Sequence, residues 1–283
     1  MAATKKSGKR HSESDGFSEI NGENWREFDE VLTDSLWLLG KRDSSGAHTG
    51  SYHGNFVPQI PRQLLLRFSK KGDWVVDPFC GSGTTMIESK RLGRNCIGID
   101  LNRALVESAI KATETDPEAA NSIAVVNAFP GDCKKKTAWD LAASMLPKSK
   151  NGFFDLAILH PPYHDIIKFN DDPACLSNCK SLEDFFAAFS GVLKLAVSHL
   201  AHGRFLAIVI GDKYEKGEWI PLGFRCMQLG LDLGLSLKGI VVKDIQDNRA
   251  KRNLENLWRV RALKSGFYIF KHEYILVFRK PSK

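Results

Sequence analysis

Long hydrophobic runs are absent from this chain of 283 residues. No segment approaches the ~18 consecutive apolar residues that a membrane-spanning helix requires. The first ten residues are polar and lack the apolar core of a secretory signal. We therefore expect no membrane association and a cytoplasmic location. Hydrophobic residues make up 43% and charged residues 26% of the chain, which excludes a fibrous or wholly disordered protein.

Closely spaced cysteine pairs are missing as well. None of the six cysteines forms a Cys-x-x-Cys motif. Cys175 and Cys179 are four residues apart, but no second pair follows at the spacing of a zinc site. The sequence thus predicts no metal site and reduced thiols, as in a reducing compartment.

Positive charge is in excess, and it is unevenly distributed. The net charge is +7, yet residues 1–50 carry seven Lys/Arg against nine Asp/Glu, so residues 51–283 carry +9. A basic body suits a polyanionic partner such as a nucleic acid. We expect an N-terminal extension over 1–50, partly disordered, with one amphipathic helix over 25–39. The main domain is expected over 51–283.

Apolar runs alternate with helical segments in that domain. Several of these runs show no polar alternation, which is typical of strands buried on both faces of a parallel sheet. The predicted fold is α/β, with a seven-stranded, mostly parallel, Rossmann-like sheet and helices on both faces. We expect strands at 74–79, 95–101, 122–128, 154–160, 204–211, 236–243 and 273–279, and helices near 59–69, 84–92, 103–114, 137–146, 181–200 and 221–230.

A glycine-rich loop, Asp77-Pro-Phe-Cys-Gly-Ser-Gly-Thr-Thr85, follows the first of these strands and opens a helix. Gly81 and Gly83 permit a tight turn and the close approach of a ligand. The helix N-terminus offers free N–H groups to an anionic ligand group. The loop is not a P-loop, and it is not a dinucleotide fingerprint, because Met86 stands where the third glycine would be.

Acidic residues follow the next two strands. Asp100 ends the second strand and is placed to accept hydrogen bonds from both ribose hydroxyls. Asp132 follows the third strand. Because the carboxyl ends of parallel strands meet at one edge of a sheet, these side chains and the glycine loop should line one crevice.

A second motif, His160-Pro-Pro-Tyr163, follows the buried strand at 154–160. Two successive prolines fix an extended backbone. They would hold a carbonyl and the flanking side chains at the mouth of the crevice.

Together these motifs resemble the amino-methyltransferases of DNA, which methylate N4 of cytosine or N6 of adenine with S-adenosylmethionine. The segments 53–61, 77–85, 98–102, 160–163 and 272–279 carry the resemblance, which implies a class I methyltransferase fold. The cofactor-binding residues that it implies are Phe56, Pro58, Asp77, Pro78, Phe79, Gly81, Gly83, Thr84, Thr85, Asp100, Leu101 and Asp132.

The catalytic residues implied by the resemblance are His160, Pro161, Pro162 and Tyr163. The Pro161 carbonyl and a neutral His160 imidazole would accept the two hydrogens of the target amine, and Tyr163 would stack on a base flipped out of the duplex. The family usually has Asp, Asn or Ser where this chain has His160. The Pro-Cys nucleophile of cytosine-C5 methylation is missing, since Cys80 follows Phe79.

A basic insert lies between the sixth and seventh predicted strands, at about 244–266. Residues 243–264 hold seven Lys/Arg and three Asp/Glu. Basic residues with an interleaved aromatic suit phosphate contact, although a solvated basic helix would look the same. The candidate nucleic-acid contacts are Arg249, Lys251, Arg252, Trp258, Arg259 and Arg261.

The predicted function is methylation of double-stranded DNA by base flipping, with N4 of cytosine slightly favoured over N6 of adenine. Two alternatives remain open. One is an RNA base methyltransferase, and the other is an inactive methyltransferase fold that still binds nucleic acid. A cognate restriction endonuclease is a possible partner, and the sequence leaves the oligomeric state open.

Overall fold

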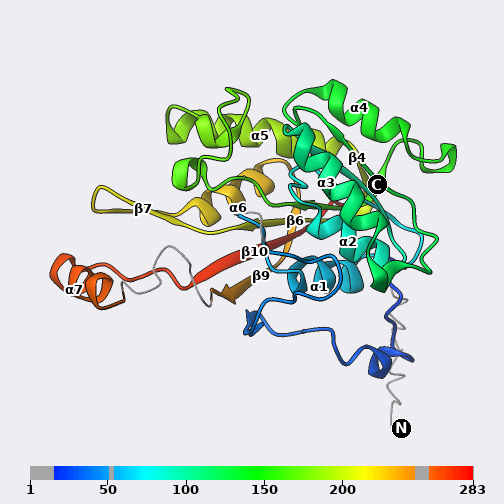
Figure 1. Ribbon diagram of the computed structural model, residues 1–283, viewed down its shortest axis with the longest axis horizontal. Helices are drawn as coiled ribbons and strands as arrows, with labels where there is room; N and C mark the ends of the chain where they lie inside the picture. Colours follow the sequence, from blue (N-terminus) through cyan, green and yellow to red (C-terminus); the bar gives the residue numbers. More distant parts are fainter. Residues whose placement is uncertain (1–15, 51–53, 246–254, 283) are drawn as a thin grey trace, which may run out of the picture.

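The centre of the molecule is an eight-stranded sheet in the order β1-β9-β10-β6-β5-β2-β3-β4 (Figure 1). The computed structural model describes residues 16–50, 54–245 and 255–282. The strands of this sheet are β1 (Leu36–Trp37), β2 (Trp74–Asp77), β3 (Asn95–Asp100), β4 (Val126–Pro130), β5 (Phe154–Leu159), β6 (Leu200–Ile210), β9 (Ser236–Asp244) and β10 (His272–Arg279). A separate hairpin pairs β7 (Lys213–Glu215) with β8 (Glu218–Ile220).

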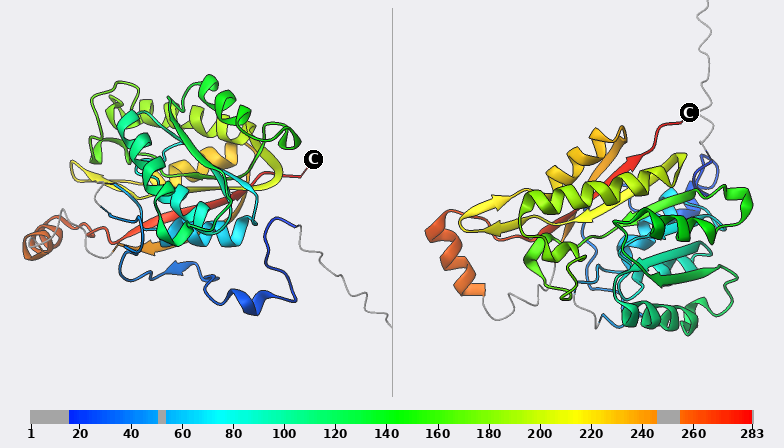
Figure 2. Two further views of the ribbon diagram at one scale, coloured as in Figure 1. Left: turned by 45° about the vertical axis from the view of Figure 1, so that its right-hand side comes forward. Right: turned by 90° about the horizontal axis from the view of Figure 1, so that it is seen from above.

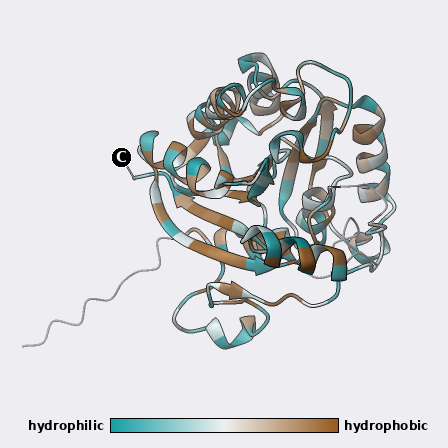
Figure 3. Ribbon diagram, turned by 90° about the vertical axis from the view of Figure 1, so that its left-hand side faces the viewer, coloured by the Kyte–Doolittle hydropathy of each residue, from teal (hydrophilic) through white to brown (hydrophobic). Residues whose placement is uncertain are grey.

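The sheet is mostly parallel, as the apolar runs predicted. Strands β2 to β6 pair in parallel, whereas β10 runs antiparallel to both β6 and β9. Every residue of β2 and β5 is buried, and hydrophobic residues predominate along the central strands (Figure 3). The third predicted strand begins later than expected, at Val126 rather than at residue 122.

Helices cover both faces of the sheet, as predicted (Figure 2). The helices are α1 (Gln59–Phe68), α2 (Thr84–Arg91), α3 (Arg103–Glu114), α4 (Lys136–Ser144), α5 (Leu182–Ser198), α6 (Leu222–Asp232) and α7 (Glu255–Ser265). One core cluster joins the sheet to α4, α5 and α6. A second joins its opposite face to α1, α2 and α3. Neighbouring residues of β5 alternate between the two, with Ile158 in the second cluster and Leu159 in the first.

The prediction of a helix over 25–39 is wrong. Only Trp25–Phe28 forms a helical turn, of the 3-10 type. Leu36–Trp37 instead forms β1, an eighth strand paired in parallel with β9. Trp37 is 3% exposed in the core while Leu36 is 58% exposed, which is the alternation of a strand. Residues 36–37 are extended because they form backbone hydrogen bonds with the outer edge of β9, which would otherwise be unpaired.

An arm projects beyond the carboxyl edge of the sheet (Figure 1). We define the arm as residues 213–220, which follow β6, and 255–271, which precede β10. Since β9 and β6 both run antiparallel to β10, their carboxyl ends lie at the same edge. Ring contacts hold the two parts together: Tyr214 lies 4.5 Å from Phe267, and Trp219 lies 4.1 Å from Phe270. Across the described ranges, no helix is long and apolar enough to cross a bilayer.

Candidate functional site

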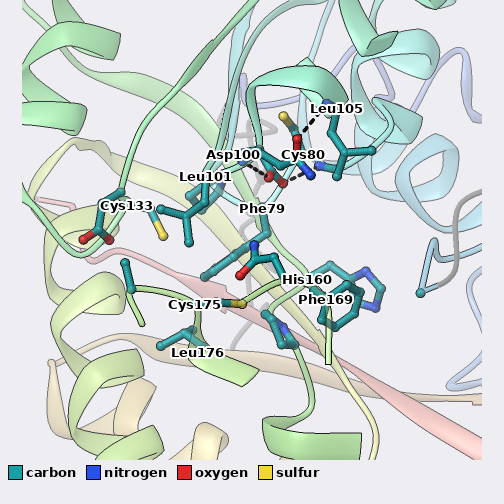
Figure 4. A pocket seen from close by; sticks show the side chains of 18 of the residues that line it. Phe79, Cys80, Asp100, Leu101, Leu105, Cys133, His160, Phe169, Cys175 and Leu176 are labelled. Carbon is teal, nitrogen blue, oxygen red and sulfur yellow. Dashed lines mark hydrogen bonds between the residues drawn. The ribbon is translucent and has the colours of Figure 1, made fainter. Parts of the chain in front are cut away.

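A cleft opens at the carboxyl edge of the sheet (Figure 4). It lies where β2, β3, β4 and β5 end, so the topology alone brings the predicted motifs together. Nine of the sixteen predicted cofactor-binding and catalytic residues line it, namely Phe56, Pro78, Phe79, Gly81, Asp100, Leu101, Asp132, His160 and Pro162. The sequence did not single out Asn55, Asn102, Leu105 and Cys133 as site residues, and they line it too.

The other predicted residues stand behind this lining. Asp77, Thr84 and Thr85 are at most 3% exposed, and Pro58 and Pro161 are buried. They, together with Gly83 and Tyr163, are not part of the cleft wall. Asp77, Thr84 and Thr85 can therefore act on a ligand only by positioning the groups that do line the cleft.

The glycine loop has the backbone that the sequence predicted. Gly81 and Gly83 have φ angles of 49° and 87°, which L side chains rarely adopt. A Cβ on Gly83 would lie 2.8 Å from the Cβ of Ala109. Glycine at this position therefore allows α2 to begin in close contact with α3.

Asp77 is a buried support of the glycine loop. Its Oδ1 accepts a hydrogen bond from the Phe79 N–H at 2.9 Å. Complete burial raises the pKa of Asp77 to about 6, against the opposing effects of Thr85 and the Phe79 N–H. This position makes Asp77 a support of the loop rather than a contact of the ligand.

Asp100 connects the loop to the cleft. Its Oδ2 accepts from the Gly81 N–H at 3.0 Å, and its Oδ1 accepts from the Asn102 N–H at 2.9 Å. Burial raises the pKa of this carboxyl group, and the backbone hydrogen bonds oppose that rise. Each carboxylate oxygen has a further lone pair, so Asp100 can accept two hydroxyl hydrogens from a diol in the cleft.

His160 stands half-buried at the end of β5. Its ring centroid lies 4.6 Å from that of Phe56, and its Nε2 lies 3.2 Å from the Tyr163 hydroxyl oxygen. That hydroxyl donates to Glu273 Oε2 at 2.8 Å. Desolvation lowers the pKa of His160 to about 4, although the charge of Glu273 acts in the opposite direction. The imidazole is therefore neutral at pH 7.

Glu273 and Lys243 were not predicted as site residues. They are cross-strand partners on β10 and β9, and both are buried. Their charged groups lie 3.1 Å apart. The sequence analysis counted Lys243 in the basic surface, and the structure corrects this. The available signal was the acidic residue Glu273 at the start of a strand whose middle is apolar.

The loop after the second motif folds over the cleft. It contributes Phe169, Asn170, Ala174, Cys175 and Leu176 to the lining. Its first residue, His164, has a φ angle of 53°, and its Nε2 lies 3.1 Å from the Cys179 carbonyl oxygen. Lys213 of the arm contacts both His164 and Asp165. The base of the loop is thus attached to the arm.

The predicted nucleic-acid contacts are only partly described. Arg249, Lys251 and Arg252 lie outside the described residues. Arg259 and Arg261 are exposed on α7, and the Arg261 guanidinium lies 5.5 Å from the Trp258 ring centre. None of the described arm residues lines the cleft.

One group of potential metal ligands occurs in the described part of the chain. Ligand atoms of Asp43, His48 and Glu88 lie within 4.8 Å of one another. The guanidinium of Arg91 lies 3.3 Å from Glu88 and 3.8 Å from Asp43. Because a side-chain cation already neutralises these carboxylates, the group is best described as an ion-pair network.

Comparison with known proteins links these motifs to methyltransferases. Residues 2–111 match a family described as DNA methylase, and residues 64–171 match one described as RMKL-like, methyltransferase domain. The Type II methyltransferase M.MjaII of Methanocaldococcus jannaschii is 45% identical over 51 residues, which cover 18% of this chain and 10% of that protein. The Type II methyltransferase M2.DpnII of Streptococcus pneumoniae is 45% identical over 69 residues, which cover 23% of this chain and 26% of that protein.

These matches span about a quarter or less of the relatives' own lengths. Similarity of structure extends further along this chain. TrmN from Thermus thermophilus superimposes with a TM-score of 0.50 at 17% identity, over 81% of this chain and 51% of that one. At this level of identity the superposition shows a shared fold.

Proposed function

We propose that this chain, which belongs to the S-adenosylmethionine-dependent amino-methyltransferase family, methylates the exocyclic amine of a base in DNA. N4 of cytosine is the favoured target, because the first residue of the tetrapeptide is not acidic. The observation that carries the proposal is the cleft, where Asp100 and the glycine loop face His160 and Pro162. A cofactor and an amine bound there would be neighbours.

The residues of the cleft fit the cofactor of this family. The Asp100 carboxylate retains acceptor capacity for a ribose diol. Leu101 and Leu105 offer apolar surface to the adenine ring, and Asp132 offers an acceptor for its amino group. The bound cofactor would supply an electrophilic methyl group on a sulfonium.

The target amine is a poor nucleophile, because its lone pair is delocalised into the base. Acceptors aimed at its two hydrogens return electron density to the nitrogen. The Pro161 carbonyl and the neutral His160 imidazole would serve as these acceptors, and Tyr163 would stack on the flipped base. A covalent route through Cys80 is disfavoured, since burial raises the pKa of this thiol well above its ordinary value.

The arm would contact the DNA backbone. Arg259 and Arg261 are exposed beyond the same sheet edge as the cleft. Such cations bind phosphates without reading sequence. A cognate restriction endonuclease is a proposed partner, because the relatives are named Type II methyltransferases.

Mass spectrometry of nucleosides tests this proposal. The protein is incubated with isotopically labelled cofactor and either duplex DNA or RNA. We expect labelled N4-methylcytosine in the DNA, whereas labelled N6-methyladenine would correct only the target base. Product in RNA alone would favour an RNA enzyme. Absence of product in both, with cofactor affinity intact, would indicate an inactive fold. The matched control is His160→Ala, which removes the proposed acceptor and keeps Asp100 and the glycine loop.

A further inference from the structure

Four polar side chains form a continuous chain that starts at the cleft and ends inside the sheet. His160 Nε2 lies 3.2 Å from the Tyr163 hydroxyl oxygen, and that hydroxyl donates to Glu273 Oε2 at 2.8 Å. Glu273 Oε1 lies 3.1 Å from Lys243 Nζ. Glu273 and Lys243 are 7% and 6% exposed. Water therefore competes little for the hydrogen bonds at this end of the chain.

The direction of these hydrogen bonds follows from counting protons. The ammonium of Lys243 favours an ionised Glu273, and an ionised carboxylate can only accept. Burial raises the pKa of Tyr163 well above its ordinary value, so the phenol keeps its single hydrogen. That hydrogen is directed at Glu273. The phenol oxygen then presents a lone pair to His160 Nε2, which must supply the hydrogen between them.

The other ring nitrogen of His160 has no such partner. Within the described ranges, no residue forms a hydrogen bond with His160 Nδ1. A neutral imidazole has one N–H and one acceptor nitrogen. If Nε2 carries the proton, Nδ1 is the acceptor. In the tautomer protonated on Nδ1, the Nε2 lone pair would face the lone pair of the Tyr163 oxygen, and no hydrogen bond could form between them.

We propose that Tyr163 and Glu273 hold neutral His160 in the tautomer protonated on Nε2, so that Nδ1 is the nitrogen that accepts a hydrogen of the target amine. An acidic side chain at this position would be an acceptor without such support. Histidine is an acceptor only when its proton is on the other nitrogen. Tyr163 and Glu273 are thus positioning residues for His160. The role of Nδ1 rests on the proposed function, whereas the tautomer is a property of the free protein.

The charged groups around the ring agree with a neutral His160. Glu273 on β10 raises its pKa and Lys243 on β9 lowers it, but desolvation is the largest influence and leaves the pKa at about 4. The ring is therefore uncharged at pH 7. The location of its one proton then decides which nitrogen can accept.

The molecule contains a second chain of the same kind, which provides a control. His272 Nε2 lies 3.0 Å from the Tyr274 hydroxyl oxygen, and Tyr274 donates to Asp212 Oδ2 at 3.4 Å. None of these three residues lines the cleft. Tyr274→Phe removes a comparable phenol without touching the His160 chain.

Long-range proton–nitrogen NMR of the full chain with ¹⁵N-labelled histidine tests the inference at pH 7. The His160 signals are assigned by their loss in His160→Gln. We expect a protonated Nε2 and an unprotonated Nδ1 in the parent protein. Tyr163→Phe should give a mixture of tautomers at His160, whereas Tyr274→Phe should leave His160 unchanged. A proton on Nδ1 in the parent protein would overturn the inference, and so would a Tyr163→Phe spectrum like that of the parent.

Glu273→Gln provides a second test. The new amide can donate to the phenol oxygen, which frees the hydroxyl hydrogen to turn towards His160 Nε2. The proton would then move to Nδ1. We expect the Nδ1-protonated form to appear in the spectrum and kcat to fall ~10- to 100-fold, with cofactor affinity unchanged. If the parent protein methylates nothing, the spectra still decide the tautomer, so the two proposals fail separately.

Discussion

His160 is the residue at which this chain departs from the family that it resembles, and its surroundings determine how it responds to pH. An imidazole in water has a pKa of about 6.5, which burial lowers and a neighbouring carboxylate raises. Burial has the larger influence and lowers the pKa to about 4. Asp165, which follows the tetrapeptide, contacts Lys213 and His164 rather than His160.

We predict that methyl transfer persists well below pH 6.5 and falls towards pH 4, since only neutral His160 accepts a hydrogen. His160→Asp should keep some activity but lose it at a higher pH than the parent, because burial raises the pKa of a carboxyl group. His160→Ala should lower the rate by a factor of ~10²–10³. Single-turnover rates between pH 4 and 8 measure all three. Equal rates for His160→Ala and the parent would make His160 a bystander.

Asp100 is the residue on which cofactor binding should depend most. Asp100→Ala should weaken S-adenosylmethionine binding by ~1.5–3 kcal/mol, because buried hydroxyls lose a charged acceptor. Calorimetry measures this affinity. Asp140→Ala is the control, since Asp140 is exposed on α4 and pairs with Lys136. An unchanged affinity in Asp100→Ala would remove Asp100 from the site.

At the scale of elements, α2 depends on the glycine at which it begins. Gly83→Ala places a methyl group 2.8 Å from the Cβ of Ala109, on a backbone with φ of 87°. We expect a loss of ~1–3 kcal/mol in the free energy of unfolding, from strain at this position. Denaturant titration measures it. The control is Gly191→Ala in α5, which has open space around it and should gain ~0.5–1 kcal/mol. Equal stability of the two variants would contradict this account of the loop.

The arm helix α7 should contribute phosphate contacts. Replacing Arg259 and Arg261 with Ala should weaken DNA binding and reduce the slope of log affinity against log salt by ~0.9 for each lost contact. Cofactor affinity should not change. The control replaces Lys148 and Lys194, which are exposed outside the arm. If only the control changes the slope, DNA binds elsewhere on the surface.

At the scale of the whole molecule, the cleft joins segments that are distant in the sequence. Its wall comes from the segment before α1 and from the loops after β2, β3, β4 and β5. A ligand that binds this wall stabilises the folded state by RT ln(1 + [L]/Kd). We predict ~2.7 kcal/mol at one hundred times Kd for S-adenosylhomocysteine, measured as a rise in the unfolding midpoint. A comparable rise in Asp100→Ala, at the same ligand concentration, would indicate binding outside this cleft.

The sequence by itself determined the parallel sheet, the glycine loop, Asp100 and the His160-Pro-Pro-Tyr163 motif. These features are local: apolar runs define buried strands, Gly81 and Gly83 permit their turn, and the spacing of strand ends places the motifs at one edge. The family resemblance could be recognised from the sequence because its motifs are short and contiguous.

The tertiary structure decided what depends on partners far along the chain. Residues 36–37 became a strand because β9 offers them an edge. The pKa of His160 falls because packing removes water from its ring. Tyr163 reaches Glu273 across 110 positions of sequence, and no local pattern encodes that contact. The proton on His160 is placed by this distant pair, since the direction of a hydrogen bond depends on which groups the fold brings together.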